Sequence, residues 1–276
     1  MNIAVWTALY AELPLHEALR TLHQHGWTSF EVSTEHLVQG DSDTAAMIDA
    51  VLPIIEELGI EIPQAHGYLQ ADVASEDERR RSDDLRTLQR HISLCAELGV
   101  KVVVIHPGGT GTDPMHSESE RTRKLNIEAF RTLGDLAGSH DIRIGLENLT
   151  RHGTAQPEEI IGLIDDINHE AIGVTLDTSH ANLVELSIPA AIRTFGSRLI
   201  ATHISDNDGS GDQHRTPGSG LIDWPPVVAA LREIGYNGLF NLEIPGERHK
   251  ILELRALKSR HALDVAKWLT GNGANS

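Results

Sequence analysis

The chain has 276 residues, with 40 acidic and 23 basic side chains and a formal net charge of −17. This negative charge disfavours nucleic acid as a partner, because a polyanion is repelled unless a local basic patch compensates. Some α/β folds reach about 250 residues as one domain. No linker or low-complexity tract divides this chain, so we expect a single domain over residues 1–276.

Short strand-like runs alternate with longer segments of helical period along the chain. The predicted strands are Ile3–Thr7, Thr28–Ser33, Glu61–His66, Val100–His106, Ile142–Glu147, Ile172–Asp177, Leu199–Ser205 and Gly238–Glu243. Residues 102–105 show no polar alternation, which fits a strand buried on both faces. Between the strands lie helices with one apolar face, such as Leu85, Leu88, Ile92 and Cys95.

Eight such βα units close most simply into a (β/α)₈ TIM barrel. An open doubly wound sheet is the alternative fold. The first βα turn, around residues 7–13, lacks the glycine-rich dinucleotide fingerprint of that alternative. The sequence therefore predicts an α/β protein with a single TIM barrel.

Polar residues stand at the C-terminal ends of six predicted strands: His66, His106, Glu147, Asp177, His203 and Glu243. In a TIM barrel these ends meet on one face and build the active site. Glu147, Asp177, His203 and Glu243 come from four consecutive strands and offer three carboxylates and one imidazole. Such a set suits Mn²⁺, Mg²⁺, Co²⁺ or Zn²⁺. A single strand-end carboxylate could simply face solvent, but three in one mouth would repel one another without a cation.

A second layer of polar residues follows these strand ends. His180 lies three residues after Asp177, Asp206 three after His203, and Asp212 and His214 lie in the glycine-rich loop 207–220. Asp-x-His places both side chains on one side of an extended segment, and glycines let the loop fold over the mouth. The predicted substrate-binding residues are His66, His106, His180, Asp212, His214, Arg215 and Trp6. For His66 and His106 an interior role, donating to backbone carbonyls, is the alternative, and for Trp6 and Trp224 it is core packing.

Six segments carry a family resemblance: "VVVIHPGG" (102–109), "GLENLT" (145–150), "VTLDTSH" (174–180), "ATHISD" (201–206), "DQHRTPGSGLIDW" (212–224) and "NLEIP" (241–245). In this order they resemble the xylose isomerase-like barrel superfamily, which includes sugar phosphate isomerases and epimerases and the family 2 apurinic endonucleases. The resemblance implies Glu147, Asp177, His203 and Glu243 as ligands of one metal ion. It also implies Glu147 and Glu243 as acid and base on opposite sides of the substrate, moving a proton through an enediolate.

The chain departs from this family's ketohexose epimerases at two substrate-binding positions. Ketohexose epimerases of this superfamily have a substrate-binding Glu and an Arg where this chain has Gly153 and Gly209, although His180 matches their substrate-contacting histidine. A simple tagatose-type epimerase is thereby disfavoured.

The chain also resembles the endonuclease branch. It has the residue types that hold three zinc ions in those enzymes at nine positions: His66, His106, Glu147, Asp177, His180, His203, Asp212, His214 and Glu243. Charge argues against DNA, because the expected mouth offers chiefly Arg151 and Arg215.

The first hypothesis is a metal-dependent isomerase or epimerase of a small sugar or polyhydroxy-carbonyl compound, with one divalent ion. The alternatives are a keto-sugar or keto-cyclitol dehydratase or lyase, a multi-zinc phosphodiesterase of endonuclease type, and a non-catalytic ligand-binding protein. No run of about 18 apolar residues exists and no signal-like segment precedes the first strand, so we expect a cytoplasmic protein without membrane contact. A homo-oligomer is compatible with the sequence.

Overall fold

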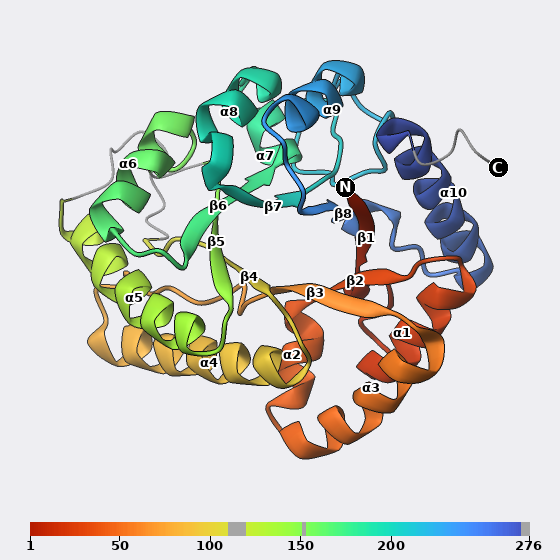
Figure 1. Ribbon diagram of the computed structural model, residues 1–276, viewed down its shortest axis with the longest axis horizontal. Coiled ribbons are helices and arrows are strands. Elements are labelled where there is room, and N and C mark those ends of the chain that lie inside the picture. The colour runs from red at the N-terminus through yellow and green to blue at the C-terminus, as the bar shows by residue number, and fades with distance from the viewer. Residues whose placement is uncertain (110–119, 151–152, 272–276) are drawn as a thin grey trace.

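The structure is a computed structural model that describes residues 1–109, 120–150 and 153–271. Eight parallel strands form a central ring that helices surround (Figure 1). The strands are β1 (Asn2–Trp6), β2 (Ser29–Val32), β3 (Glu61–His66), β4 (Val102–Ile105), β5 (Arg143–Glu147), β6 (Ile172–Asp177), β7 (Leu199–His203) and β8 (Leu239–Leu242). All eight predicted strands are confirmed, and the fold is an α/β TIM barrel.

Several predicted strand ranges run one or two residues past the observed ends. Thr7 does not end β1 but begins a short 3₁₀ helix, η1 (Thr7–Tyr10). The Thr7 hydroxyl accepts a hydrogen bond from the Ser33 N–H at 2.9 Å, which ties the end of β1 to the segment after β2. His106 and Glu243 follow β4 and β8 directly, so they still lie at the C-terminal end of the ring.

Neighbouring strands pair in parallel in the order β7-β6-β5-β4-β3-β2-β1-β8. The ring closes between β7 and β8 through an isolated bridge, Ile204 to Leu242. Beside this bridge the Thr202 hydroxyl donates to the Leu239 carbonyl at 2.7 Å and accepts the Asn241 N–H at 3.4 Å. A side chain thus replaces part of the main-chain ladder at this seam.

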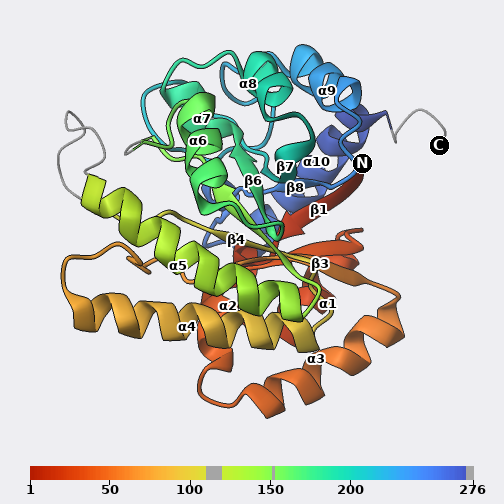
Figure 2. The same cartoon turned by 60° about the vertical axis from the view of Figure 1, so that its left-hand side comes forward.

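Helices cover the outside of the ring. Two helices follow β2, and two follow β6. The helices are α1 (Leu15–Gln24), α2 (Thr34–Gly40), α3 (Thr44–Leu58), α4 (Glu78–Glu97), α5 (Glu120–Ser139), α6 (Pro157–Ile167), α7 (Thr178–Leu183), α8 (Ile188–Phe195), α9 (Trp224–Glu233) and α10 (Leu252–Thr270), with short 3₁₀ helices η2 (Gly196–Arg198) and η3 (Pro245–Glu247). Figure 2 shows α4 and α5 side by side along one flank. In α4 the predicted apolar face is confirmed, because Leu88, Ile92 and Cys95 are buried against the strands.

The helix ends follow their sequence signals in part. Gly59 ends α3 in the left-handed region with φ 60°, where a residue without Cβ is favoured. Asp223 occupies the N-cap position of α9, but its side chain makes no capping hydrogen bond. Among the described helices, none has both the length and the apolar character that a membrane span requires.

Candidate metal centre

The barrel brings the four predicted metal ligands together at the C-terminal end of the ring. Glu147, Asp177 and His203 are the last residues of β5, β6 and β7, and Glu243 directly follows β8. All four side chains are buried. One ligand atom from each lies within 4.8 Å of those of the other three. Glu147 pairs with Thr175, and Asp177 pairs with His203, so the parallel ladder brings these strand ends together.

The imidazole of His203 is held from both sides. Its Nδ1 lies 3.2 Å from Glu147 Oε1 and 3.2 Å from Glu243 Oε2. Its Nε2 lies 2.9 Å from Oε1 of Glu31, a fully buried residue of β2. Glu31 was not among the predicted site residues. A charged residue inside a short apolar strand, Phe30-Glu31-Val32, is the signal that could have found it.

The donor atoms of this set fit a divalent cation. Asp177 Oδ2, His203 Nδ1 and His66 Nε2 are buried without a hydrogen-bond partner in the described structure. Buried polar atoms are normally paired, because an unpaired one costs free energy. Three carboxylates and an imidazole nitrogen, with buried atoms left over for coordination, form an arrangement in which a cation supplies the missing partner.

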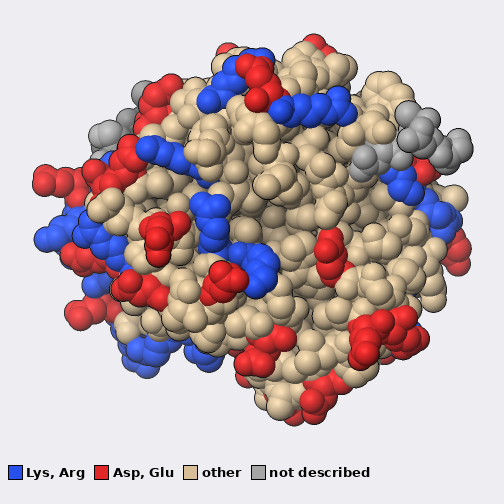
Figure 3. All heavy atoms as spheres, in the orientation of Figure 1, with Lys and Arg blue, Asp and Glu red and all other residues tan. Residues whose placement is uncertain are grey.

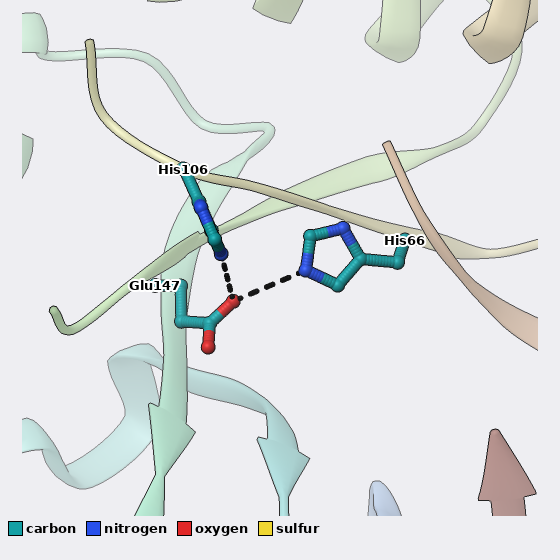
Figure 4. A group of neighbouring side chains, drawn as sticks. All are labelled: His66, His106 and Glu147. Carbon is teal, nitrogen blue, oxygen red and sulfur yellow. Dashed lines mark hydrogen bonds and ion pairs between the residues drawn. The ribbon is translucent and has the colours of Figure 1, made fainter. Parts of the chain in front are cut away.

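A second group lies beside the first and shares Glu147 with it. His106 Nε2 and His66 Nε2 lie 3.1 Å and 3.5 Å from the same oxygen, Glu147 Oε2, and Figure 4 shows both rings turned toward it. The Nδ1–H of His66 donates to the Gly67 carbonyl at 3.0 Å, which is the kind of bond that the alternative, interior role of this histidine predicts. This bond leaves the Nε2 lone pair free to act as a ligand.

A third group forms around Asp212. His180 Nε2 and His214 Nε2 lie 3.4 Å and 2.8 Å from its two carboxylate oxygens. The Nδ1–H of His180 donates to the Asn148 carbonyl at 2.9 Å, and that of His214 to the Glu243 carbonyl at 3.2 Å. His214 has φ 43°, a left-handed conformation that is rare outside glycine and turns its side chain inward. The loop thus brings Asp212 and His214 to the strand ends, as predicted.

Burial and charge separate the two carboxylates beside His203. Burial raises the pKa of Glu147, but the charges of His203 and His106 outweigh it and hold this pKa well below its ordinary value. In Glu243 burial prevails and the pKa is raised. Burial lowers the pKa of His203, but Glu243 and Glu31 outweigh it, so this pKa lies well above its ordinary value. A cation bound here would compete with the proton on His203.

The loop after β7 is anchored by Asp206. Its buried carboxylate accepts hydrogen bonds from the backbone N–H groups of Asn207, Gly218 and Ile222, at 2.9, 2.8 and 3.2 Å, and from the Trp224 indole at 3.0 Å. Asp206 therefore supports the loop and does not extend the polar layer as we expected from its spacing. The ring of Trp224 packs against that of Phe240, with 6.4 Å between the ring centroids, so this tryptophan belongs to the core.

Trp6 and Arg215 are the remaining predicted substrate contacts. Trp6 ends β1, is buried beside Ala8 and Ala11, and its indole N–H has no partner in the described structure. The guanidinium of Arg215 lies 3.5 Å from Asp208 Oδ2 and is partly exposed. Their contact with a substrate stays a prediction, as do the roles of the other site residues. Arg151 lies outside the described residues.

The described surface shows no broad basic face in the view of Figure 3, where Lys and Arg side chains are scattered among Asp and Glu. This distribution agrees with the overall excess of acidic residues. Polyanion binding draws on clustered basic side chains, so nothing on this face, which is the end of the barrel where β1 begins, favours nucleic acid. The C-terminal strand ends lie on the far side of this view.

Comparison with known proteins places this geometry in a family. The sequence model described as xylose isomerase-like TIM barrel matches residues 19–269. The 3-dehydro-D-guloside 4-epimerase of Escherichia coli K12 is 27% identical over 238 residues, which cover 80% of this chain and 84% of that protein. A D-psicose 3-epimerase from Enterocloster bolteae is 31% identical over 133 residues, covering 47% of this chain and 42% of that protein. The crystal structure of 3-keto-D-glucoside 4-epimerase from E. coli superposes with a TM-score of 0.81 and 24% identity, covering 98% of this chain and 99% of that one, and this likeness shows the shared fold.

Proposed function

The chain belongs to the xylose isomerase-like TIM barrel family, and on that premise we propose that it is a metal-dependent isomerase or epimerase of a small polyhydroxy-carbonyl compound. The names of its relatives support the sugar-like substrate class, since they include epimerases of a ketohexose and of a keto-glycoside. One observation carries the proposal. Two buried carboxylates, Glu147 and Glu243, each lie 3.2 Å from His203 Nδ1 in a set of four converging ligand atoms.

In this proposal Glu147, Asp177, His203 and Glu243 hold one divalent ion, of Mn²⁺, Mg²⁺, Co²⁺ or Zn²⁺. When bound, such an ion stabilises negative charge on the oxygens of a carbonyl substrate and so acidifies the neighbouring C–H. One of the two glutamates removes that proton, which gives an enediolate, and the other returns a proton to the opposite face or to the next carbon. His66, His106, His180, Asp212 and His214 line the same end of the barrel and would bind substrate hydroxyl groups.

Two substitutions test the division between the glutamates. Glu147→Gln and Glu243→Gln should each abolish turnover of ketohexoses and keto-glycosides, because an amide cannot carry the proton. At least one variant should retain metal. If two bases share the transfer, one variant should still exchange the substrate α-proton in D₂O although neither completes the reaction. Glu233→Gln, an exposed carboxylate of α9 paired with Arg193, is the control and should leave turnover unchanged. Full activity in either glutamate variant contradicts the two-carboxylate mechanism.

The same experiment separates two neighbouring hypotheses. A dehydratase or lyase shares the proton-abstraction step, but its product has lost water or a fragment, which mass spectrometry of the product reveals. A protein that only binds its ligand would bind metal and sugar yet exchange no α-proton with D₂O. Gly153 and Gly209, which replace polar residues of ketohexose epimerases, make a substrate other than a simple ketohexose the first choice for this assay.

A multi-zinc phosphodiesterase is the second candidate, and one observation favours it. His180 and His214 both have Nδ1–H bound to backbone carbonyls and both point Nε2 at Asp212. Imidazole nitrogens fixed in this way around a carboxylate suit a further cation. Elemental analysis distinguishes the candidates, because the isomerase proposal expects one tightly bound ion per chain and the phosphodiesterase expects three.

A further inference from the structure

Glu31 has no role in the proposed proton transfer, yet it is the residue that contacts His203 from behind. It lies in β2, its side chain is fully buried, and its Oε1 is 2.9 Å from His203 Nε2. The other ring nitrogen, Nδ1, faces Glu147 and Glu243. The two nitrogens of this histidine are therefore divided between the ligand set and Glu31.

We infer that Glu31 is a positioning residue that fixes the tautomer and the orientation of His203 for metal binding. An ionised carboxylate can only accept hydrogen bonds, so the ring nitrogen beside it must carry the hydrogen. A neutral imidazole has one N–H, and its other nitrogen then bears the lone pair. Glu31 thereby directs the Nδ1 lone pair into the ligand set. The inference rests on the metal site of the proposed function and is independent of the sugar reaction.

Glu31 is itself held in place by two buried amides. The Gln64 side chain of β3 donates to Oε1 at 3.1 Å, and the Asn241 side chain of β8 donates to Oε2. Both carboxylate oxygens are thus occupied, and three donors from β3, β7 and β8 converge on one residue of β2. This anchoring leaves the carboxylate little freedom, so the ring of His203 receives a fixed direction. A purely structural role, in which Glu31 only links strands, is the competing explanation.

Two variants separate these explanations. Glu31→Gln keeps an oxygen for His203 but loses the charge, and Asn241 can accept its new N–H because Asn241 Oδ1 has no partner in the described structure. This variant should fold. Glu31→Leu also removes the acceptor of Nε2–H. Outer partners of metal-bound histidines typically contribute about 10–100-fold to metal affinity. The control is Thr175→Val, a near-isosteric change of a buried barrel hydroxyl that has no partner among the described residues.

The measurement is the affinity for Co²⁺ by competition with a chelator, together with the visible spectrum of the Co²⁺ protein. We expect Glu31→Gln to bind about 10–100-fold more weakly, Glu31→Leu more weakly still with shifted bands, and Thr175→Val within twofold of the parent protein. Affinities of both Glu31 variants within twofold of the parent would overturn the inference. If neither variant folds, ¹⁵N spectra of the Zn²⁺-loaded parent decide: hydrogen on Nε2 supports the inference, and hydrogen on Nδ1 overturns it.

The results also separate this inference from the proposed function. A parent protein that binds no divalent ion refutes both. Weakened Co²⁺ binding in the Glu31 variants, combined with no turnover of any keto-sugar by the parent, refutes the sugar reaction and supports the role of Glu31. Metal-dependent turnover with unchanged affinity in both variants does the reverse.

Discussion

Replacing Asp206 with Asn should destabilise the protein by several kcal/mol, because one carboxylate holds four donors. Asn207, Ile222 and the Trp224 indole donate to it from buried positions, and Gly218 donates from an exposed one. An asparagine offers one oxygen and one NH₂ group, so two of the four donors lose their acceptor. Each buried donor left unpaired costs about 1–3 kcal/mol, and the exposed Gly218 N–H can turn to water, so the loss is about 1–6 kcal/mol.

Urea unfolding followed by tryptophan fluorescence and circular dichroism measures this loss in the free energy of unfolding. Asp223→Asn is the matched control, since Asp223 lies in the same loop region, is exposed and makes no capping bond. It should change stability by less than about 0.5 kcal/mol. Asp212 and His214 lie in the loop that Asp206 anchors. Turnover should fall as well, because both side chains would be less well positioned. An Asp206→Asn protein within about 0.5 kcal/mol of the parent would refute this view of the loop.

Three further predictions concern the metal, the pH and the backbone. Asp177→Asn should weaken divalent metal binding by more than about tenfold, because a neutral amide gives up the charge of the ligand; unchanged affinity in a chelator competition would remove Asp177 from the ligand set. Burial lowers the pKa of His180 and His214, but Asp177 and nearby carboxylates outweigh it and raise both to about 10. Because these folded-state values exceed the unfolded value of 6.5, the stabilisation is fully present below about pH 6.5 and is lost as the pH rises through 10. Urea unfolding of the chelator-treated protein should record a free energy of unfolding that falls by several kcal/mol over that range, and a flat profile would contradict the assignment. Gly246→Ala would place a Cβ 2.2 Å from a loop carbonyl oxygen and should cost about 1–3 kcal/mol by thermal unfolding, whereas Gly211→Ala, with open space around it, should be neutral; equal stabilities would show that the loop yields at no cost.

The fold and the four-ligand set could be predicted from local patterns. Apolar runs and helical periods give the eight strands, and the parallel arrangement brings the last polar residue of each strand to one end. Glu147, Asp177 and His203 each end an apolar run, so the sequence marks them directly. Local patterns are sufficient for these residues because the ends of parallel strands meet at one end of the barrel.

The supporting residues could not be predicted in the same way. Glu31 lies inside a strand rather than at its end, and its partner His203 is 172 positions away. The bonds of Asp206 reach as far as Trp224, 18 positions along the loop, and depend on the closed path of that loop. No local period encodes either contact. Glycines between residues 207 and 220 indicated a loop free to fold over the mouth, whereas its ends are pinned by hydrogen bonds.

The seam between β7 and β8 is the place where metal binding should affect local unfolding of the barrel. His203 and Glu243 stand on opposite sides of this seam, where main-chain pairing is confined to the bonds around Ile204. Native proteins open first where few backbone bonds hold them, and such opening is seen as amide hydrogen exchange. A ligand that contacts both sides of the seam shifts that equilibrium toward the closed form. The Glu243 amide donates to the Ile204 carbonyl at 3.2 Å. Its hydrogen exchange should therefore be slower when a metal ion is bound to the ligand set.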